Sequence, residues 1–202
     1  RTFLDSSYTI QVGNSLSITV NDTSIDPDDY SGSTQTTGTI AIGGSTSGEI
    51  ESSYDIDWFS ISLLGGHTYQ FDMEGSPTSK GTLTDPYIRG IYDQSGSILT
   101  NSQSDDDDRG TGRNSRIIYT PTTSGTYYLG AWGYYTATGT YQVSVKDTTS
   151  TYLLTTNSSS INEGDTITST LSTTNVSSGT TIYWTTFSDD LSSTDFSSSS
   201  SI

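Results

Sequence analysis

Carboxylates carry most of the chemistry that this sequence could perform. The densest group is an acidic loop, whose candidate metal-binding and ligand-binding positions are Asp105, Asp106, Asp107, Asp108, Arg109, Gly110, Arg113 and Asn114. Adjacent carboxylates repel one another, so such a run is either solvated or neutralised by a divalent cation. Calcium takes about six to eight oxygen ligands, and glycine lets backbone carbonyls turn inward. Asp85 is the natural cross-strand partner and Asn114 could add an amide oxygen, so we expect a calcium site here, with a solvated loop as the alternative.

A second acidic group lies further toward the N-terminus. Its members are Asp26, Asp28, Asp29, Asp55 and Asp57. Asp55 and Asp57 are two positions apart at the start of an expected strand, and side chains at this spacing leave a strand by the same face. The sequence favours a second metal site or, alternatively, a cluster of aspartates that form turns.

Two further groups could contact a ligand. Arg109 and Arg113 flank the acidic loop, where a guanidinium could hold a carboxylate or could simply balance local charge. For Arg116, within an expected strand, we favour charge balance. Trp132, Tyr134 and Tyr135 form an aromatic cluster that is either core or an exposed patch suited to stacking on a sugar or peptide.

Composition excludes several classes of protein. The 202 residues contain 7 Lys and Arg against 23 Asp and Glu, a net charge of −16, which disfavours nucleic-acid binding. No apolar run approaches the ~20 residues that span a bilayer, so we expect no membrane insertion. The absence of Cys removes disulfides, thiol catalysis and cysteine-based zinc sites, and the single His67 disfavours a histidine-based centre. We therefore expect a protein that is not an enzyme.

Short alternating runs rich in Ile, Val, Thr and Tyr predict an all-β fold. One face of the run that contains Phe59, Ile61 and Leu63 is apolar, which is typical of a sheet with one face on a core. Turn residues separate the runs, so we expect an antiparallel β-sandwich of the jelly-roll type. The clearest runs are 57–64, 68–73, 87–92, 115–120, 125–132 and 139–145, and the weaker ones are 39–42, 48–51 and 97–100.

The two ends of the chain differ from its middle in composition and in the pattern of their alternating runs. Residues 1–24 contain two alternating runs, 8–12 and 15–20, separated by a Gly-Asn turn. Residues 148–202 are rich in Thr and Ser, with expected strands at 152–155, 166–171 and 180–184. We therefore divide the chain into residues 1–24, a central domain of residues 25–147, and residues 148–202.

The middle of the chain, residues 37–147, resembles the bacterial pre-peptidase C-terminal domain, a β-sandwich of secreted peptidases and large surface proteins. The matching segments are 48–50, 55–59, 64–71, 81–87, 91–96, 105–108 with Gly110 and Gly112, 114–117 and 123–129. The resemblance supports calcium at the acidic loop. In collagen-binding relatives of this family, an acidic N-terminal segment and an Asp-rich strand start share calcium, and the second acidic group resembles that layout.

The flanks resemble Calx-β-like repeats of giant RTX-type adhesins from marine bacteria. Segment 12–24 looks like the closing strands of such a repeat and segment 161–166 like its opening strands, so the flanks either pair into one small sandwich or are halves of neighbouring repeats. This context implies a calcium-dependent adhesion module at the bacterial cell surface, monomeric within a long multidomain chain. Its ligand would be a peptide or protein on a host or neighbouring cell, or alternatively a glycan, and would complete the calcium shell. A calcium-stiffened spacer and an accessory domain of a secreted hydrolase are the other interpretations.

Overall fold

The computed structural model describes residues 28–99, 110–162 and 164–183. Within these ranges the chain forms nine strands and one short 3-10 helix, and no helix there is long and apolar enough to cross a membrane. The elements are β1 (Ser45–Ile50), β2 (Ile56–Leu63), β3 (Tyr69–Glu74), η1 (Ser76–Thr78), β4 (Pro86–Tyr92), β5 (Ser115–Tyr119), β6 (Gly125–Gly133), β7 (Gly139–Asp147), β8 (Thr151–Thr156) and β9 (Ser169–Thr174).

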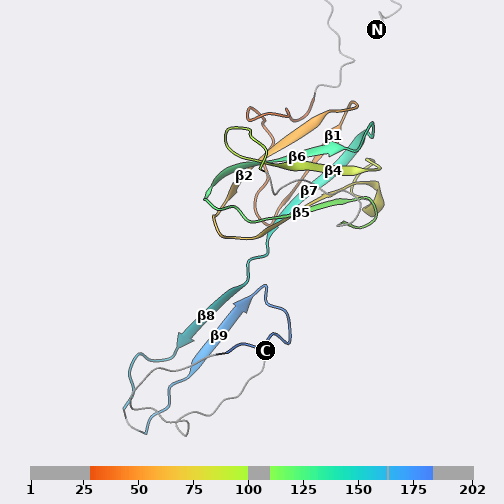
Figure 1. Cartoon of the computed structure of the whole chain (residues 1–202). Coiled ribbons are helices and arrows are strands. Elements are labelled where there is room, and N and C mark those ends of the chain that lie inside the picture. Colours follow the sequence, from red (N-terminus) through yellow and green to blue (C-terminus); the bar gives the residue numbers. More distant parts are fainter. Residues whose placement is uncertain (1–27, 100–109, 163, 184–202) are drawn as a thin grey trace, which may run out of the picture.

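Strands β1 to β7 form a two-layered antiparallel β-sandwich (Figure 1). One sheet has the order β1-β7-β3-β5 and the other has the order β2-β6-β4. Each strand turns alternate side chains toward the interior, as the sequence pattern predicts. Buried residues from all seven strands meet between the sheets, among them Ile50, Phe59, Phe71, Ile88, Ile117, Leu129 and Val143. The expected all-β sandwich class is confirmed.

Several strand bounds differ from those expected. β1 begins three residues earlier than the run at 48–51, because its pairing with β7 continues back to Ser45. The weak runs at 39–42 and 97–100 contribute only isolated bridges, Thr39 to Ser60 and Ile98 to Tyr92. Among the described residues each run forms only one bridge, so alternation alone overstates the length of its strand.

The hairpin of β8 and β9 projects away from the sandwich (Figure 1). Nearly all of its side chains are exposed, and β9 lies three residues later than the expected strand at 166–171. Pairing with β8 sets these bounds, since a Thr- and Ser-rich run has no apolar face to fix a register. Residues 180–183 form no strand, and the expected strands within residues 1–24 lie outside the described ranges.

Different strand ends and different side chains lie at the two ends of the sandwich. At one end, which we call the acidic end, lie the start of β2, the start of β4, the end of β6 and the start of β7, as the pairings Ile56–Trp132, Pro86–Gly133 and Ile50–Gly139 require. At the opposite end β7 finishes and continues toward β8. There the His67 Nδ1 lies 2.7 Å from an oxygen of Asp147, so His67 is a paired turn residue rather than a fully solvated one.

Candidate functional site

Four carboxylates converge at the acidic end. Asp28, Asp29, Glu51 and Asp57 each offer one oxygen, and these oxygens all lie within 4.8 Å of one another. Asp55 lies beside them, where burial and the negative charge of Glu51 raise the pKa of Asp55. We call these five residues the carboxylate cluster. Four of them belong to the second acidic group expected from the sequence, and Asp26 lies outside the described residues.

Three segments of the chain bring the cluster together. The segment around Asp29 is tied to β1, because the Asp29 N–H donates to Glu51 Oε1 at 3.0 Å and the Glu49 N–H donates to Asp29 Oδ2 at 3.1 Å. A turn after β1 then reverses the chain into β2, and the Asp55 N–H donates to the Ser52 carbonyl within it. The cluster therefore fastens the segment before the sandwich to the β1–β2 connection.

Asp57 is the most deeply buried member of the cluster. It is the first core-facing residue of β2 and its side chain has no solvent exposure. The hydroxyl of Tyr141, from β7 in the facing sheet, donates to Asp57 Oδ2 at 2.5 Å. The other oxygen, Oδ1, is buried without a hydrogen-bond partner among the described residues, and the same holds for Glu51 Oε2 and Asp55 Oδ2. Unpartnered buried carboxylate oxygens destabilise a fold, so these atoms are suited to a bound cation.

The burial of these carboxylates also raises their pKa values. Burial raises the pKa of Asp57 to about 9, against the lowering effect of the Tyr141 hydrogen bond. Burial and the neighbouring Glu51 raise the pKa of Asp55 to about 7 and that of Asp29 to about 6. Without a cation the folded cluster therefore holds protons near neutral pH. A divalent ion would replace these protons, because it stabilises the ionised carboxylates that it contacts.

The acidic loop expected to bind calcium is described only in part. Asp105, Asp106, Asp107, Asp108 and Arg109 lie outside the described residues, so their role stays a prediction. Asp85 is nearly buried just before β4, and Arg113 Nη1 lies 2.6 Å from its Oδ2. Arg113 therefore balances the negative charge of Asp85, and the expected role of Asp85 as a calcium ligand stays a prediction.

Asn114 and Gly110 have structural roles in the same region. Asn114 Oδ1 accepts the Gly75 N–H at 3.0 Å, and its Nδ2 donates to Thr78 at 2.8 Å. A Cβ on Gly110 would lie 2.0 Å from the Asn114 carbonyl oxygen, so only glycine fits there. The expected use of Asn114 as a calcium ligand remains untested. Arg116 contacts Asp72 on β3, in keeping with the charge-balance interpretation.

The aromatic cluster lies at the acidic end as well. Trp132 is half-buried on the outer face of β6, whereas Tyr134 and Tyr135 are exposed in the loop that follows. Gly133 does not disturb the alternation, since it faces the core. The Tyr134 N–H donates to the Asp85 carbonyl at 3.0 Å, so the aromatic loop adjoins the Asp85–Arg113 pair. The three aromatic residues are therefore a surface cluster and not core.

Sequence reasoning missed Glu51 and Tyr141. Glu51 directly follows β1 and lies four residues before Asp55, and a strand–turn–strand interpretation of 45–63 could have placed the two together. Tyr141 has no such signal, because it sits in the middle of a regular alternating run. Only the packing of β7 against β2 brings its hydroxyl to Asp57.

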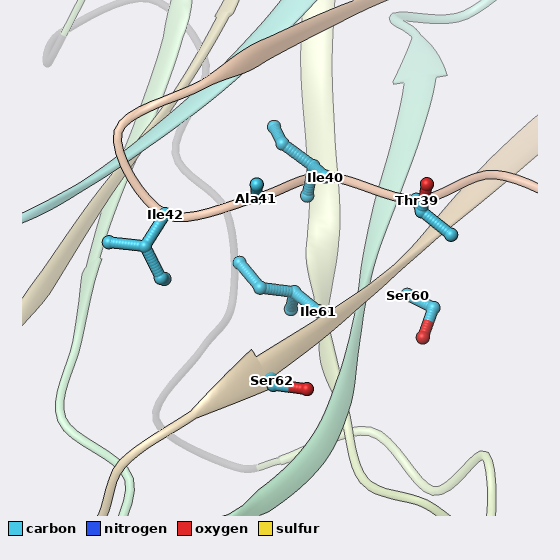
Figure 2. A pocket seen from close by; sticks show the side chains of 7 residues that line it. All are labelled: Thr39, Ile40, Ala41, Ile42, Ser60, Ile61 and Ser62. Carbon is cyan, nitrogen blue, oxygen red and sulfur yellow. The ribbon is translucent and has the colours of Figure 1, made fainter.

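A shallow pocket lies away from the acidic residues, where residues 39–42 cross β2 (Figure 2). Its volume is about 440 Å³, and its lining residues are Thr39, Ile40, Ala41, Ile42, Ser60, Ile61 and Ser62. None of these side chains is titratable, and none belongs to the site expected from the sequence. The pocket therefore offers neither a metal ligand nor a general acid or base.

No family model and no curated protein sequence matches this chain. Among solved structures, the pre-peptidase C-terminal domain of a collagenase from Bacillus anthracis is similar, with 16% identity, 54% of this chain and 93% of that chain covered, and a TM-score of 0.39. Two periplasmic inhibitors of g-type lysozyme also match. They are PliG of Aeromonas hydrophila (15% identity, 54% and 96% covered, TM-score 0.33) and PliG of Salmonella Typhimurium (17%, 54% and 99%, TM-score 0.31).

Proposed function

We propose that this chain is a calcium-dependent ligand-binding module of an extracellular, adhesion-type bacterial protein, and that it is not an enzyme. The observation that supports calcium is the carboxylate cluster. It gathers four acidic side chains at one point, with Asp55 beside them, and includes buried carboxylate oxygens that have no other partner among the described residues. Oxygen-only donor sets of this kind suit hard divalent cations, and calcium above all.

The cluster can supply most of a calcium shell. Four of its carboxylates each bring one oxygen within 4.8 Å of the others, and water or backbone carbonyls can complete the about six to eight ligands that calcium binds. Asp57 holds the deepest position and Tyr141 fixes its orientation from the facing sheet. A bound ion would displace protons from the acids whose pKa values are raised.

Ligand binding is assigned to the same end of the sandwich. Asp85 directly precedes β4 and pairs with Arg113, and the exposed tyrosines follow β6, where the Tyr134 N–H donates to the Asp85 carbonyl. The starts of β2 and β4 are two strand spacings apart, about 10 Å, so calcium at the cluster would order the edge beside this region. In the proposal, loops at one end of a rigid sandwich carry the binding residues.

A second function is favoured by the position of the cluster. It ties the segment of Asp28 and Asp29 to the β1–β2 connection, which is where a calcium ion would stiffen a junction between domains. A passive spacer would need calcium only there. It would gain stability from calcium and would bind no ligand at the acidic end.

Thermal unfolding with excess calcium and with EGTA tests the calcium proposal. At a calcium concentration about a hundredfold above Kd, the ion should add about 2.7 kcal/mol, or roughly 10 °C in melting temperature. Asp57→Asn should abolish most of this gain, whereas Asp165→Asn, an exposed acid in the β8–β9 region, should leave it intact. Equal melting temperatures of the wild-type protein in calcium and in EGTA would refute the proposal.

A further inference from the structure

The outer face of the three-stranded sheet carries a row of aromatic side chains. The alternation that sends Phe59 and Leu129 into the core turns every second residue of the same strands outward. On this sheet the outward residues include an unusual number of large rings. They are Trp58 of β2, Tyr87 and Tyr92 of β4, and Tyr128 and Trp132 of β6.

The row has two groups of rings, and Arg89 lies between them. Trp58 lies 4.1 Å from Tyr92 and 5.5 Å from Tyr128, measured between ring centroids. Gly130 leaves the space for this packing, because a Cβ there would come within 2.9 Å of the Tyr92 ring. The Arg89 guanidinium then lies 5.1 Å from the centroid of Trp132, which extends the row along β6.

One end of the row is covered and the other is open. Trp58 and Tyr128 are buried, and the Tyr128 hydroxyl donates to the Thr34 carbonyl in the segment that covers them. At the open end, Tyr134 is 38% exposed and Tyr135 is 65% exposed. We call the four rings at the open end, Tyr87, Trp132, Tyr134 and Tyr135, the aromatic platform.

The platform is built by contacts and not by chance proximity. Tyr87 meets Trp132 edge-on at 5.4 Å and stacks on Tyr134 at 5.8 Å, with an interplanar angle of 30°. Tyr134 in turn meets Tyr135 at 4.7 Å. Tyr135 adopts a φ of +54°, in the left-handed region that side chains other than those of Gly, Asn and Asp rarely occupy. An unfavourable backbone therefore displays an exposed ring, and such strain clusters at binding sites.

The charges around the platform select the ligand. A net charge of −16 repels anions at long range. The position over Trp132 where a cation would stack is already taken, because the Arg89 guanidinium lies there. An uncharged ligand with apolar faces and many hydroxyl groups meets no such penalty. Pyranose rings fit this description, since their C–H faces stack on aromatic rings while their hydroxyls bond to guanidinium and phenol groups.

We propose that the aromatic platform binds an uncharged glycan chain, with sugar rings stacked on Tyr134 and Tyr135 and hydroxyls held by Arg89. This assignment rests on the ligand-binding function proposed above and names its ligand class. The platform lies on the start of β4, the end of β6 and the turn between β6 and β7.

Native affinity electrophoresis tests the assignment directly, because the strong negative charge moves the protein readily through a gel. The probes are three neutral polysaccharides, namely dextran, laminarin and galactomannan, with alginate as the anionic comparison. Each gel is run with calcium and with EGTA. We expect at least one neutral polysaccharide to retard the wild-type protein and alginate to have no effect.

Two variants identify the surface responsible. Tyr134→Ala with Tyr135→Ala removes the exposed rings and should weaken retardation at least tenfold. Tyr152→Ala is the matched control, since this tyrosine is 54% exposed on β8, far from the acidic end, and its loss should change nothing. Circular dichroism and the melting temperature of each variant report whether it is folded.

The outcomes separate this inference from the calcium proposal. No retardation by any of the three neutral polysaccharides, or equal retardation of the wild-type protein and the double variant, overturns the glycan assignment. Binding of a proline-rich peptide that the double variant loses would assign the platform to a protein ligand instead. In either case a calcium-dependent rise in melting temperature would leave the calcium site standing.

Discussion

Asp57 should make the metal-free sandwich less stable as pH rises. In the unfolded chain its carboxyl ionises near the ordinary pKa of 3.8, whereas in the folded protein burial raises the pKa to about 9. Between these values the folded state holds a proton that the unfolded state has lost. Each pH unit in that window therefore removes about 1.36 kcal/mol from the free energy of unfolding, and the step from pH 5 to pH 7 removes about 2.7 kcal/mol.

Asp57→Asn isolates this contribution. The amide keeps the size of the side chain and an oxygen that can accept the Tyr141 hydroxyl, but it cannot ionise. Asp29 and Asp55 also have raised pKa values and lower stability in the same direction, and they are present in both proteins. The difference in slope between wild type and variant therefore belongs to Asp57.

Urea unfolding in EGTA, followed by tryptophan fluorescence at three pH values from about pH 5 to about pH 7, measures both slopes. We expect the wild-type protein to lose at least about 2.7 kcal/mol over this range and the variant to lose that much less. Asp165→Asn should keep the wild-type slope. The reasoning fails if wild-type stability is constant over the range, or if Asp57→Asn retains the full slope.

Two more predictions concern the neighbouring residues. Arg113→Gln should lower the free energy of unfolding by about 1 kcal/mol to the same extent in calcium and in EGTA, because the exposed Arg113 pairs with the nearly buried Asp85. A loss in EGTA alone, measured by urea unfolding, would instead make Asp85 a calcium ligand, because calcium would then replace the charge of Arg113. Gly133→Ala should cost about 2 kcal/mol or more, since its Cβ would lie 2.0 Å from the Ala137 carbonyl oxygen. Gly125→Ala, which meets nothing within 4 Å, should change stability by less than about 0.5 kcal/mol, and equal losses in both glycine variants would refute the steric argument.

The strands of the sandwich could be predicted because burial enforces their alternation. The run around Phe59 and Ile61 has the same apolar face in the sequence and in the structure. The pattern fails where no core enforces it. In β9, Ser and Thr occupy both faces, so only hydrogen bonding to β8 fixes where the strand begins. Edge segments such as that of Thr39 alternate as strands do but pair at a single bridge.

The candidate site was predictable in its residue types and less so in its contacts. The spacing of Asp55 and Asp57 places both carboxylates on one face, and the structure brings Asp57 together with Asp28 and Asp29. Local spacing could not reveal that Glu51 joins them, nor that Tyr141 reaches Asp57 from the other sheet. Likewise, the sequence offers Arg113 as a ligand-binding group, while its pairing with Asp85 depends on how two separate loops pack.

The placement of the chain's two connections at opposite ends of the sandwich has a mechanical consequence. A pulling force applied through Asp28 and Asp147 would run lengthwise along β7, whose 9 residues span about 26 Å from first to last. The carboxylate cluster stands where the load arrives, so a divalent ion held there would act as a clamp that keeps the leading segment from peeling away under tension.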